Sequence, residues 1–461
     1  MRVSRWTLAM LGGLLQACAP LSPNIDVVLP ALPPAYEQGD PGGARDGVVL
    51  ASEWWRAFGS DGLDVLMQQA VTQAAPLQQA QARVLQARAQ ARMAGARLWP
   101  ELEGSLSAQR QAPFESRHGP ARSDYVAGLV MRYELDVWGR NAALADSATA
   151  QAQAAAYELD VLRVSVQGEV AYLWLQMLGD RHRLRIARDN LAVARRLLAL
   201  LEARSQAGAA SPLELAQQRG LLASQQRALH GLEAVAVRNR LELSALLGQV
   251  QVLPEPQDDI LTLHVPSVQT GLPSALLGQR PDIARLEARL AAAQADLRAA
   301  RAALYPSLTL GASTGARGDH WRKSLEHPVY SLLSGLVAPI FNAGRLQADA
   351  QWNHARLQEL LAEYRQGVVQ AYVEVEDVLA QLRGIDAQAL ANEQEWTQAR
   401  LALNLAETRY RAGSETLLTL LDAQRSFYAA QDLRVQLTTN RLQARADLFR
   451  ALGGGWQAPG A

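Results

Sequence analysis

The segment LWPELEGSLSA at residues 98–108 recurs as LYPSLTLGAS at residues 304–313. In each copy a proline ends an Ala- and Arg-rich helical tract, and alternating apolar and polar residues follow at once. Alternation with a period of two residues is typical of a β-strand. A change from helix to strand at the same point of both copies indicates a repeated supersecondary unit.

Three further landmarks keep the same spacing between copies, which is about 205 residues. They are Gly139-Arg140 with Gly344-Arg345, Ala207-Gly208 with Ala412-Gly413, and Leu247-Gly248 with Leu452-Gly453. We therefore predict a first repeat at residues 51–248 and a second at 281–453. A duplicated unit favours a symmetric wall, tube or ring over a single catalytic cleft.

Each repeat is predicted to carry one β-hairpin. Residues 125–137 show the alternation more clearly, with Tyr125, Leu129 and Tyr133 on one face and Arg132 and Glu134 on the other. The second repeat shows the same alternation of apolar and polar residues from residue 307, followed by a more apolar strand that ends at residue 340. The hairpins are placed at residues 101–137 and 307–340.

A long helical hairpin is predicted after each β-hairpin, at residues 140–248 and 345–452. The outgoing helices would each be roughly 100 Å long if continuous. Gly208 and Gly413 suit the left-handed conformation that ends a helix, and Ser211-Pro212 suits the start of the next. The fold class is α+β and mostly α, with a linker at 249–280 and a flexible tail at 454–461.

The N-terminus predicts export. Arg2 and Arg5 precede an apolar run that is too short to span a bilayer, so residues 1–17 are interpreted as a signal peptide. The run ends in Leu15-Gln16-Ala17-Cys18, which resembles the lipobox of bacterial lipoproteins. That resemblance implies a covalent lipid on Cys18 and sorting to the outer membrane. The Pro- and Gly-rich residues 18–50 are expected to form an acylated arm on the surface.

Composition and motifs argue against several functions. Basic and acidic residues balance at 45 each, which gives nucleic acid no electrostatic attraction. Cys18 is the only cysteine, so no disulfide can form within the chain. The seven histidines lack metal-ligand spacing, and His320 and His327 are interpreted as exposed loop residues. We expect neither an enzyme nor a metal site, and no cofactor besides the lipid.

The predicted strands would leave two edges without a partner strand. Four strands in an open sheet leave unpaired backbone groups, which lipid cannot satisfy. If the strands enter a membrane, several chains must pool them, and three chains would supply twelve. The alternative is that the hairpins pack as small sheets on the helical body. The Ala-rich helices likewise need neighbours along their length, in either a hollow ring or a solid bundle.

Motifs spread over nearly the whole mature chain resemble those of the TolC-type outer-membrane efflux proteins. They are WWxxF at residues 54–58, ELDxWGR at 134–140, RPDI at 280–283, YRAG at 410–413 and LLDAQR at 420–425. The lipobox makes the chain most similar to the OprM and NodT branch. The resemblance implies a homotrimer in which a twelve-stranded membrane β-barrel continues into a periplasmic α-helical barrel.

The same resemblance implies partners and a function. Such proteins are exit ducts of tripartite pumps that export drugs or other small molecules. They dock a periplasmic adaptor, also called a membrane fusion protein, and an inner-membrane RND-type antiporter. Alternatives are the duct of a type I secretion or metal-efflux system. From a different class, a periplasmic structural or adaptor lipoprotein with a helical-hairpin bundle is also considered.

By position in the family's pattern, the periplasmic gate maps to Leu418, Asp422 and Arg425. Asp422 and Arg425 are three residues apart and share a helix face, and rings of Leu418 or Asp422 are recognised ways to gate a pore. An ordinary solvated helical pair is the alternative. Candidate adaptor contacts are the turn residues Gly208, Ser211, Gly413 and Ser414, and Glu214 and Arg219 lie near the first turn without an assigned role.

Overall fold

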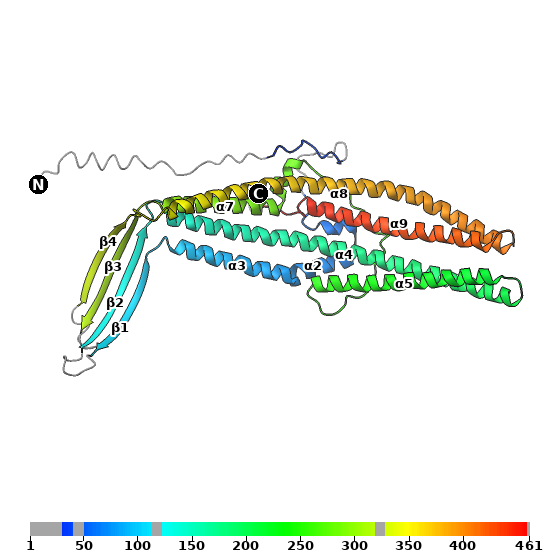
Figure 1. The fold of residues 1–461 in the computed structure, drawn as a ribbon, viewed down its shortest axis with the longest axis horizontal. Coiled ribbons are helices and arrows are strands. Elements are labelled where there is room, and N and C mark those ends of the chain that lie inside the picture. Colours follow the sequence, from blue (N-terminus) through cyan, green and yellow to red (C-terminus); the bar gives the residue numbers. More distant parts are fainter. Residues whose placement is uncertain (1–29, 40–49, 113–121, 319–327, 459–461) are drawn as a thin grey trace. The chain divides into compact units, whose positions relative to one another are not determined.

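The computed structural model describes residues 30–39, 50–112, 122–318 and 328–458. The predicted signal peptide, Cys18, His320 and His327 lie outside the described residues. In the described part, long helices predominate and four strands form one sheet (Figure 1). The predicted α+β, mostly α fold is confirmed. No helix among the described residues is both long and apolar enough to cross a membrane.

The chain packs as two compact units, and each takes corresponding segments from both predicted repeats. Unit 1 contains Arg83–Ala155 and Arg285–Arg365, which include all four strands. Unit 2 contains Pro30–Ala82, Ala156–Ala284 and the chain from Gln366 onward. The two compact units therefore do not coincide with the two predicted repeats, because each unit contains segments of both.

In unit 1 the two predicted hairpins join into a single antiparallel sheet. The strands are β1 (Glu101–Gln111), β2 (Arg122–Leu135), β3 (Ser307–Gly318) and β4 (Pro328–Val337). Their spatial order is β1-β2-β3-β4, so β2 and β3 also pair with each other. Within the sheet, the pairing of β2 with β3 joins the first repeat to the second. β1 and β4 are the two edges.

One face of this sheet is apolar and largely exposed. The register places alternate residues of neighbouring strands on a common face. The large exposed apolar residues on this face are Leu102, Leu106, Leu129, Tyr330, Leu332 and Leu336. The opposite face of β1 carries Glu101, Glu103, Ser105, Ser107 and Gln109, whereas β4 exposes Val329, Leu333 and Val337 there.

The motif ELDVWGR makes the transition from sheet to helix in unit 1. The Asp136 carboxylate accepts hydrogen bonds from the backbone N–H groups of Asn141 (3.0 Å) and Ala142 (2.7 Å) and so caps the next helix. The Trp138 indole N–H donates to the Pro306 carbonyl at 2.7 Å. The first repeat is therefore held to the second at the point where strands become helices.

The helices lie where the periodicity predicts them. The outgoing helices α4 (Arg140–Gln206) and α8 (Arg345–Arg411) have 67 residues each, and the return helices α5 (Pro212–Leu246) and α9 (Leu417–Ala451) have 35 each. The equal lengths confirm that the two helical hairpins are built alike. The remaining helices are η2 (Trp54–Phe58), α2 (Asp61–Gln73), α3 (Ala75–Ala96), η4 (Pro273–Ala275), α6 (Leu276–Gln279) and α7 (Pro281–Ala302).

The core of unit 2 explains the tryptophan motif near the N-terminus. Trp54 is 2 % exposed and stacks on Phe449 of α9 with ring centroids 5.0 Å apart. Phe58 is fully buried beside both rings. Gly179 of α4 shows how closely the helices pack, because a Cβ there would clash with the Thr439 hydroxyl of α9. Small residues therefore allow the close helix approach that the composition indicates.

The flexible tail predicted from residue 454 needs correction for the described residues 454–458. The Gly454 N–H donates to the Phe449 carbonyl at 2.8 Å, and the Trp456 indole N–H donates to Asp160 of α4 at 3.0 Å. Trp456 also meets Tyr157 edge-on. The three glycines have positive φ and allow the tight turn that brings this tryptophan back onto α4. A glycine run taken alone is typical of a flexible tail, and the sequence does not show the contact of Trp456 that orders this one.

Candidate functional site

The turns that close the two helical hairpins in unit 2 have the same backbone geometry. We call residues 204–214, between α4 and α5, turn 1, and residues 409–419, between α8 and α9, turn 2. Gly208 and Gly413 both have φ of 73°. The residue after each glycine donates to the carbonyl five positions earlier, at 2.7 Å in turn 1 and 3.0 Å in turn 2. This is the Schellman arrangement, which satisfies the last carbonyls of a helix.

The return helices begin with different caps. In turn 1 the Ser211 hydroxyl accepts from the Glu214 N–H, and the Glu214 carboxylate accepts from the Ser211 N–H at 2.7 Å, a complete capping box. In turn 2 the Thr416 hydroxyl accepts from the Thr419 N–H at 3.3 Å. The neighbouring Glu415 accepts from both the Thr416 N–H and the Thr419 hydroxyl. These hydrogen bonds hold the pKa of Glu415 below its ordinary value.

A small apolar cluster packs the two hairpins together beside these turns. Its members come from all four long helices: Leu201, Leu221, Ala406, Tyr410, Leu417, Leu420 and Leu421. The guanidinium of Arg204 lies 5.7 Å from the centre of the Tyr410 ring, a cation–π contact that adds to the apolar packing. Burial raises the pKa of the Tyr410 hydroxyl, so the ring enters this core as a neutral phenol. Tyr410 is thus a structural residue whose role its motif alone does not reveal.

The three gate candidates form one exposed row on α9. Leu418, Asp422 and Arg425 follow the helical spacing i, i+4, i+7, and all three side chains are exposed. The opposite face of the same helix is buried in the apolar cluster. Neither Asp422 nor Arg425 forms an ion pair or hydrogen bond with another described residue. The row is therefore free to act on something outside the chain.

Two charged residues beside turn 1 are used in contacts within the first hairpin. Glu214 belongs to the capping box, and the Arg219 guanidinium pairs with Glu202 of α4 at 3.1 Å. These contacts give both residues a local structural role that the sequence did not assign. The adaptor-contact candidates Gly208, Ser211, Gly413 and Ser414 are all exposed at the two turns.

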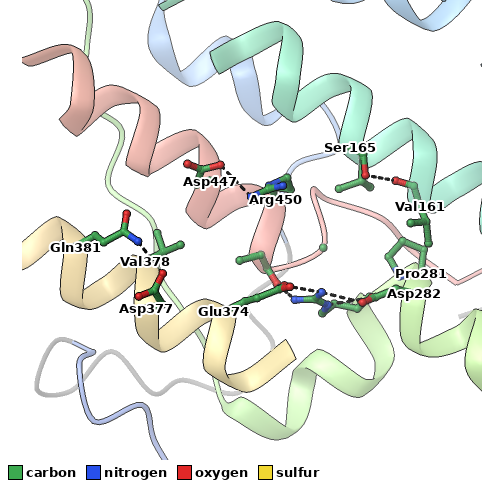
Figure 2. Close-up of a pocket in the computed structure, with 14 residues that line it drawn as sticks. Val161, Ser165, Pro281, Asp282, Glu374, Asp377, Val378, Gln381, Asp447 and Arg450 are labelled. Atoms are coloured by element: carbon green, nitrogen blue, oxygen red, sulfur yellow. Dashed lines mark hydrogen bonds and ion pairs between the residues drawn. The ribbon is translucent and has the colours of Figure 1, made fainter. Parts of the chain in front are cut away.

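A second polar site in unit 2 surrounds Arg280 of the motif RPDI. Arg280 is 8 % exposed and its guanidinium contacts Asp282 at 2.8 Å, Glu374 of α8 at 2.9 Å and the Ala451 carbonyl at the end of α9 at 2.8 Å. Figure 2 shows Asp282 and Glu374 turned toward each other across this junction. Arg280 thereby connects the inter-repeat linker with both helices of the second hairpin.

The electrostatics of this junction favour the ionised pair. Burial works to lower the pKa of Arg280, but hydrogen bonds and charge from Asp282 and Glu374 outweigh it and raise that pKa above its ordinary value. Burial likewise works to raise the pKa of Asp282, and Arg280 reverses it to a lowered pKa. The cavity beside the junction has a volume of about 310 Å³ and is also lined by Asp447 and Arg450, which pair at 3.2 Å. Its charges are thus largely compensated.

No group of three or more His, Cys, Asp or Glu side chains in the described chain is arranged to hold a metal ion. His182 of α4 is nearly buried and lies 3.0 Å from Asp259 of the linker, and burial lowers the pKa of His182. This histidine therefore serves the attachment of the linker to α4.

An exposed apolar sheet face combined with two matching helical hairpins defines the class of outer-membrane channel proteins. The sequence pattern of the family described as outer membrane efflux protein matches residues 66–249 and 272–454, which correspond to the two predicted repeats. The chain belongs to this family. It is an outer-membrane efflux channel protein, as the resemblance implied.

Individual relatives support this assignment along nearly the whole chain. The chain is 42% identical over 455 residues to the pyoverdine export outer membrane protein OpmQ of Pseudomonas putida, covering 96% of both chains. It is 44% identical over 416 residues to OpmQ of Pseudomonas aeruginosa, covering 88% of both. The solved structure of the outer-membrane channel OprN superposes with a TM-score of 0.84 at 28% identity, covering 94% of this chain and 100% of OprN. Similarity to channel proteins of this kind sets aside the adaptor-lipoprotein alternative.

Proposed function

We propose that the protein forms a homotrimeric exit duct of a tripartite efflux pump. The observation that carries the proposal is the open four-stranded sheet, whose edges β1 and β4 have no partner strand in the described chain. Unpaired backbone groups and an exposed apolar face are compatible with lipid only if the sheet closes. Three copies supply twelve strands, with the apolar face toward lipid and the polar face of β1 toward the lumen.

Two lysine substitutions on adjacent residues of β1 test this arrangement. Leu106→Lys places a charge on the apolar face, where a lipid-facing cation costs about 2–4 kcal/mol near the bilayer centre. Ser107→Lys places the same charge on the polar face and is the matched control. We expect Leu106→Lys to abolish heat-modifiable trimer bands in detergent while Ser107→Lys retains them. Equal trimer yields for both variants would contradict the proposed orientation.

The lipid on Cys18 is a further part of this proposal. The support is the lipobox tetrapeptide that ends the signal-like segment. Mass spectrometry of the mature N-terminus is expected to show a diacylglyceryl cysteine, and Cys18→Ser to remove it. A lipid-free mature N-terminus in the wild-type chain would refute lipidation without affecting the channel assignment.

Within the duct, we assign the exposed row of Leu418, Asp422 and Arg425 to the periplasmic constriction. Three copies around an axis would present a ring of leucines and a ring of carboxylates, which oppose the free passage of ions. The support is that these side chains are exposed and that Asp422 and Arg425 have no partner in the described chain.

The pump partners are proposed to be a periplasmic adaptor and an inner-membrane RND-type antiporter. Turns 1 and 2 supply exposed backbone and small side chains for the adaptor, at Gly208, Ser211, Gly413 and Ser414. A photoreactive amino acid at position 211 or 414 should cross-link the adaptor in cells that express the complete pump. The same probe at the buried position of Leu243 is the negative control. Absence of adaptor cross-links at both turns would reject this docking site.

We further propose that the exported compound is of the pyoverdine kind. The relatives that carry this name are 42% and 44% identical to the chain over most of its length. Deletion of the gene is expected to lower the pyoverdine-type siderophore in the medium under iron limitation, and the intact gene to restore it. Unchanged siderophore with increased sensitivity to drugs or metals would instead favour general drug export or metal efflux.

A further inference from the structure

A short segment of the N-terminal arm is held against α8 in unit 2 by backbone hydrogen bonds. The Glu376 carboxylate accepts from the N–H groups of two consecutive residues, Glu37 at 2.6 Å and Gln38 at 2.9 Å. Both carboxylate oxygens are used, one for each N–H. Hydrogen bonds to an ionised acceptor are among the stronger ones in proteins. Glu376 therefore binds backbone groups of the arm and not its side chains.

An aromatic contact fixes the same segment one residue earlier. Tyr36 is only 7 % exposed although none of the other described residues of the arm, 30–35 and 37–39, is buried, and its ring stacks on Tyr372 with centroids 5.7 Å apart. The Tyr372 hydroxyl donates to Glu376 at 2.7 Å. Burial, together with the Glu376 charge, raises the pKa of Tyr372 to about 12, so this hydroxyl remains a donor at neutral pH. One carboxylate thus organises both the receiving ring and the arm.

A third contact lies further along α8. The Arg383 guanidinium donates to the Gln38 side-chain oxygen at 2.8 Å and to the Gly39 carbonyl at 2.9 Å. The segment of residues 36–39 therefore meets a carboxylate at its N–H groups and a guanidinium at its carbonyl. These residues form a turn in which the Gly39 N–H donates to the Tyr36 carbonyl at 3.3 Å, and the two opposite charges fix the orientation of this turn on α8.

We infer that the α8 surface formed by Tyr372, Glu376 and Arg383 is a binding site for the chain's own N-terminal arm. The partner it fits is a hydrogen-bonded turn that begins with an aromatic residue and leaves the next two backbone N–H groups free, as in residues 36–39. The site attaches the arm to the helical body independently of any lipid on Cys18. Only residues 19–35 then lie between Cys18 and the attached segment. This inference goes beyond the proposed function and does not depend on it.

Amide hydrogen exchange on the full-length protein in detergent tests the inference. In the wild-type chain the amides of Glu37 and Gln38 should be protected. Glu376→Ala should speed their exchange by about tenfold or more, since it removes hydrogen bonds to a charged acceptor. The matched control is Asp377→Ala, because Asp377 is the next residue of α8 and bonds only to Gln381 within the described chain. This control should leave both amides protected.

A variant of the arm itself separates release of the arm from damage to α8. Tyr36→Ala leaves every α8 side chain in place and should also expose the amides of Glu37 and Gln38. Fast exchange of both amides in the wild-type chain would overturn the inference. So would equal deprotection by Glu376→Ala and Asp377→Ala, or full protection in Tyr36→Ala and Glu376→Ala alike.

Proteolysis of a lipid-free chain tests the independence from lipid. A protease specific for glutamate can cut after Glu37 only when the arm leaves α8. In a Cys18→Ser background, the bond after Glu37 should resist cleavage while the arm is bound. Adding Glu376→Ala should accelerate this cut by about tenfold or more, by the same loss of charged hydrogen bonds. Rapid cleavage in Cys18→Ser alone would show that the lipid, not α8, holds the arm.

Discussion

Turn 1 and turn 2 share a backbone but differ in what their charges do. Both end the outgoing helix with a glycine at φ of 73° and the same Schellman hydrogen bonds. The repeat offset pairs Gln217 with Asp422 and Gly220 with Arg425. Turn 1 therefore has no counterpart of the exposed charges on α9, and its nearby Arg219 is paired with Glu202.

The two copies of the repeat share the backbone geometry of the turn but not the charged side chains beside it. Turn geometry is required in both copies because the last carbonyls of each outgoing helix need partners. Charge at the exposed face is not required for either turn to form. Beside the turns, Asp422 and Arg425 of the second hairpin have no partner in the described chain, whereas Glu214 and Arg219 of the first are paired. The two turns are therefore structurally alike but electrostatically different.

The largest effect is expected from removing the uncommitted charges. Asp422→Ala combined with Arg425→Ala should raise the single-channel conductance in planar bilayers several-fold, because a charged constriction is a barrier to ions. The matched control is Gln217→Ala with Gly220→Ala at the equivalent positions of the first hairpin, which should leave conductance unchanged. Equal conductance in both double variants would show that the two hairpins do not differ in gating.

The second-largest effect is expected from replacing the glycine that has positive φ in both turns. Gly208→Ala and Gly413→Ala each force a Cβ into the left-handed region, at a cost of roughly 1–2 kcal/mol. Space is not limiting, since a Cβ at either position meets nothing within 4 Å. We expect similar losses in the local opening free energy measured by amide exchange of the adjoining helix ends. Loss at only one turn would show that the backbones are less alike than their φ angles indicate.

A smaller effect should come from the different N-caps. Ser211→Ala removes a hydroxyl that accepts from the Glu214 N–H and donates to the Glu214 carboxylate. Thr416→Ala removes a hydroxyl that accepts from the Thr419 N–H and contacts the Thr419 hydroxyl. Loss of either cap should cost about 1 kcal/mol. Amide exchange at Glu214 and Thr419 measures the two losses. Because Glu415 also accepts from the Thr419 hydroxyl, turn 2 should retain part of its order in Thr416→Ala. A larger loss in turn 2 than in turn 1 would contradict this compensation.

The smallest effect is a pH dependence confined to turn 2. The pKa of Glu415 is lowered by the Thr416 N–H and then by the Thr419 hydroxyl. Its stabilising contribution is therefore present above the unfolded pKa of about 4.3 and is lost as pH falls through the lower folded pKa. The Thr416 amide should be more protected in the wild type than in Glu415→Gln at pH 6, and the difference should vanish in strong acid. A difference that persists in acid would exclude the carboxylate as its source.

Regular periodicity made most of the fold predictable. The four strands and four long helices were placed from alternation, helical spacing and the prolines and glycines that end each element, such as Pro100 and Gly413. The motifs led to the family, but they did not show that Tyr410 packs the core or that Arg280 connects the linker with α8 and α9. Those roles depend on residues far apart in the chain. The tail was predicted to be flexible because Gly453-Gly454-Gly455 gives no sign of the Trp456 contact with Asp160.

The sequence by itself determined the duplication, the order of helices and strands and the turns between them, because these depend on periodicity and on local backbone preferences. Only the tertiary structure decided that β2 pairs with β3, that Glu376 receives the arm and that Arg219 is paired while Asp422 is not. The first two are contacts between segments distant in sequence, and the third depends on how the two helices of a hairpin pack. Such contacts depend on which faces meet when the helices and strands pack, and no local pattern records that choice.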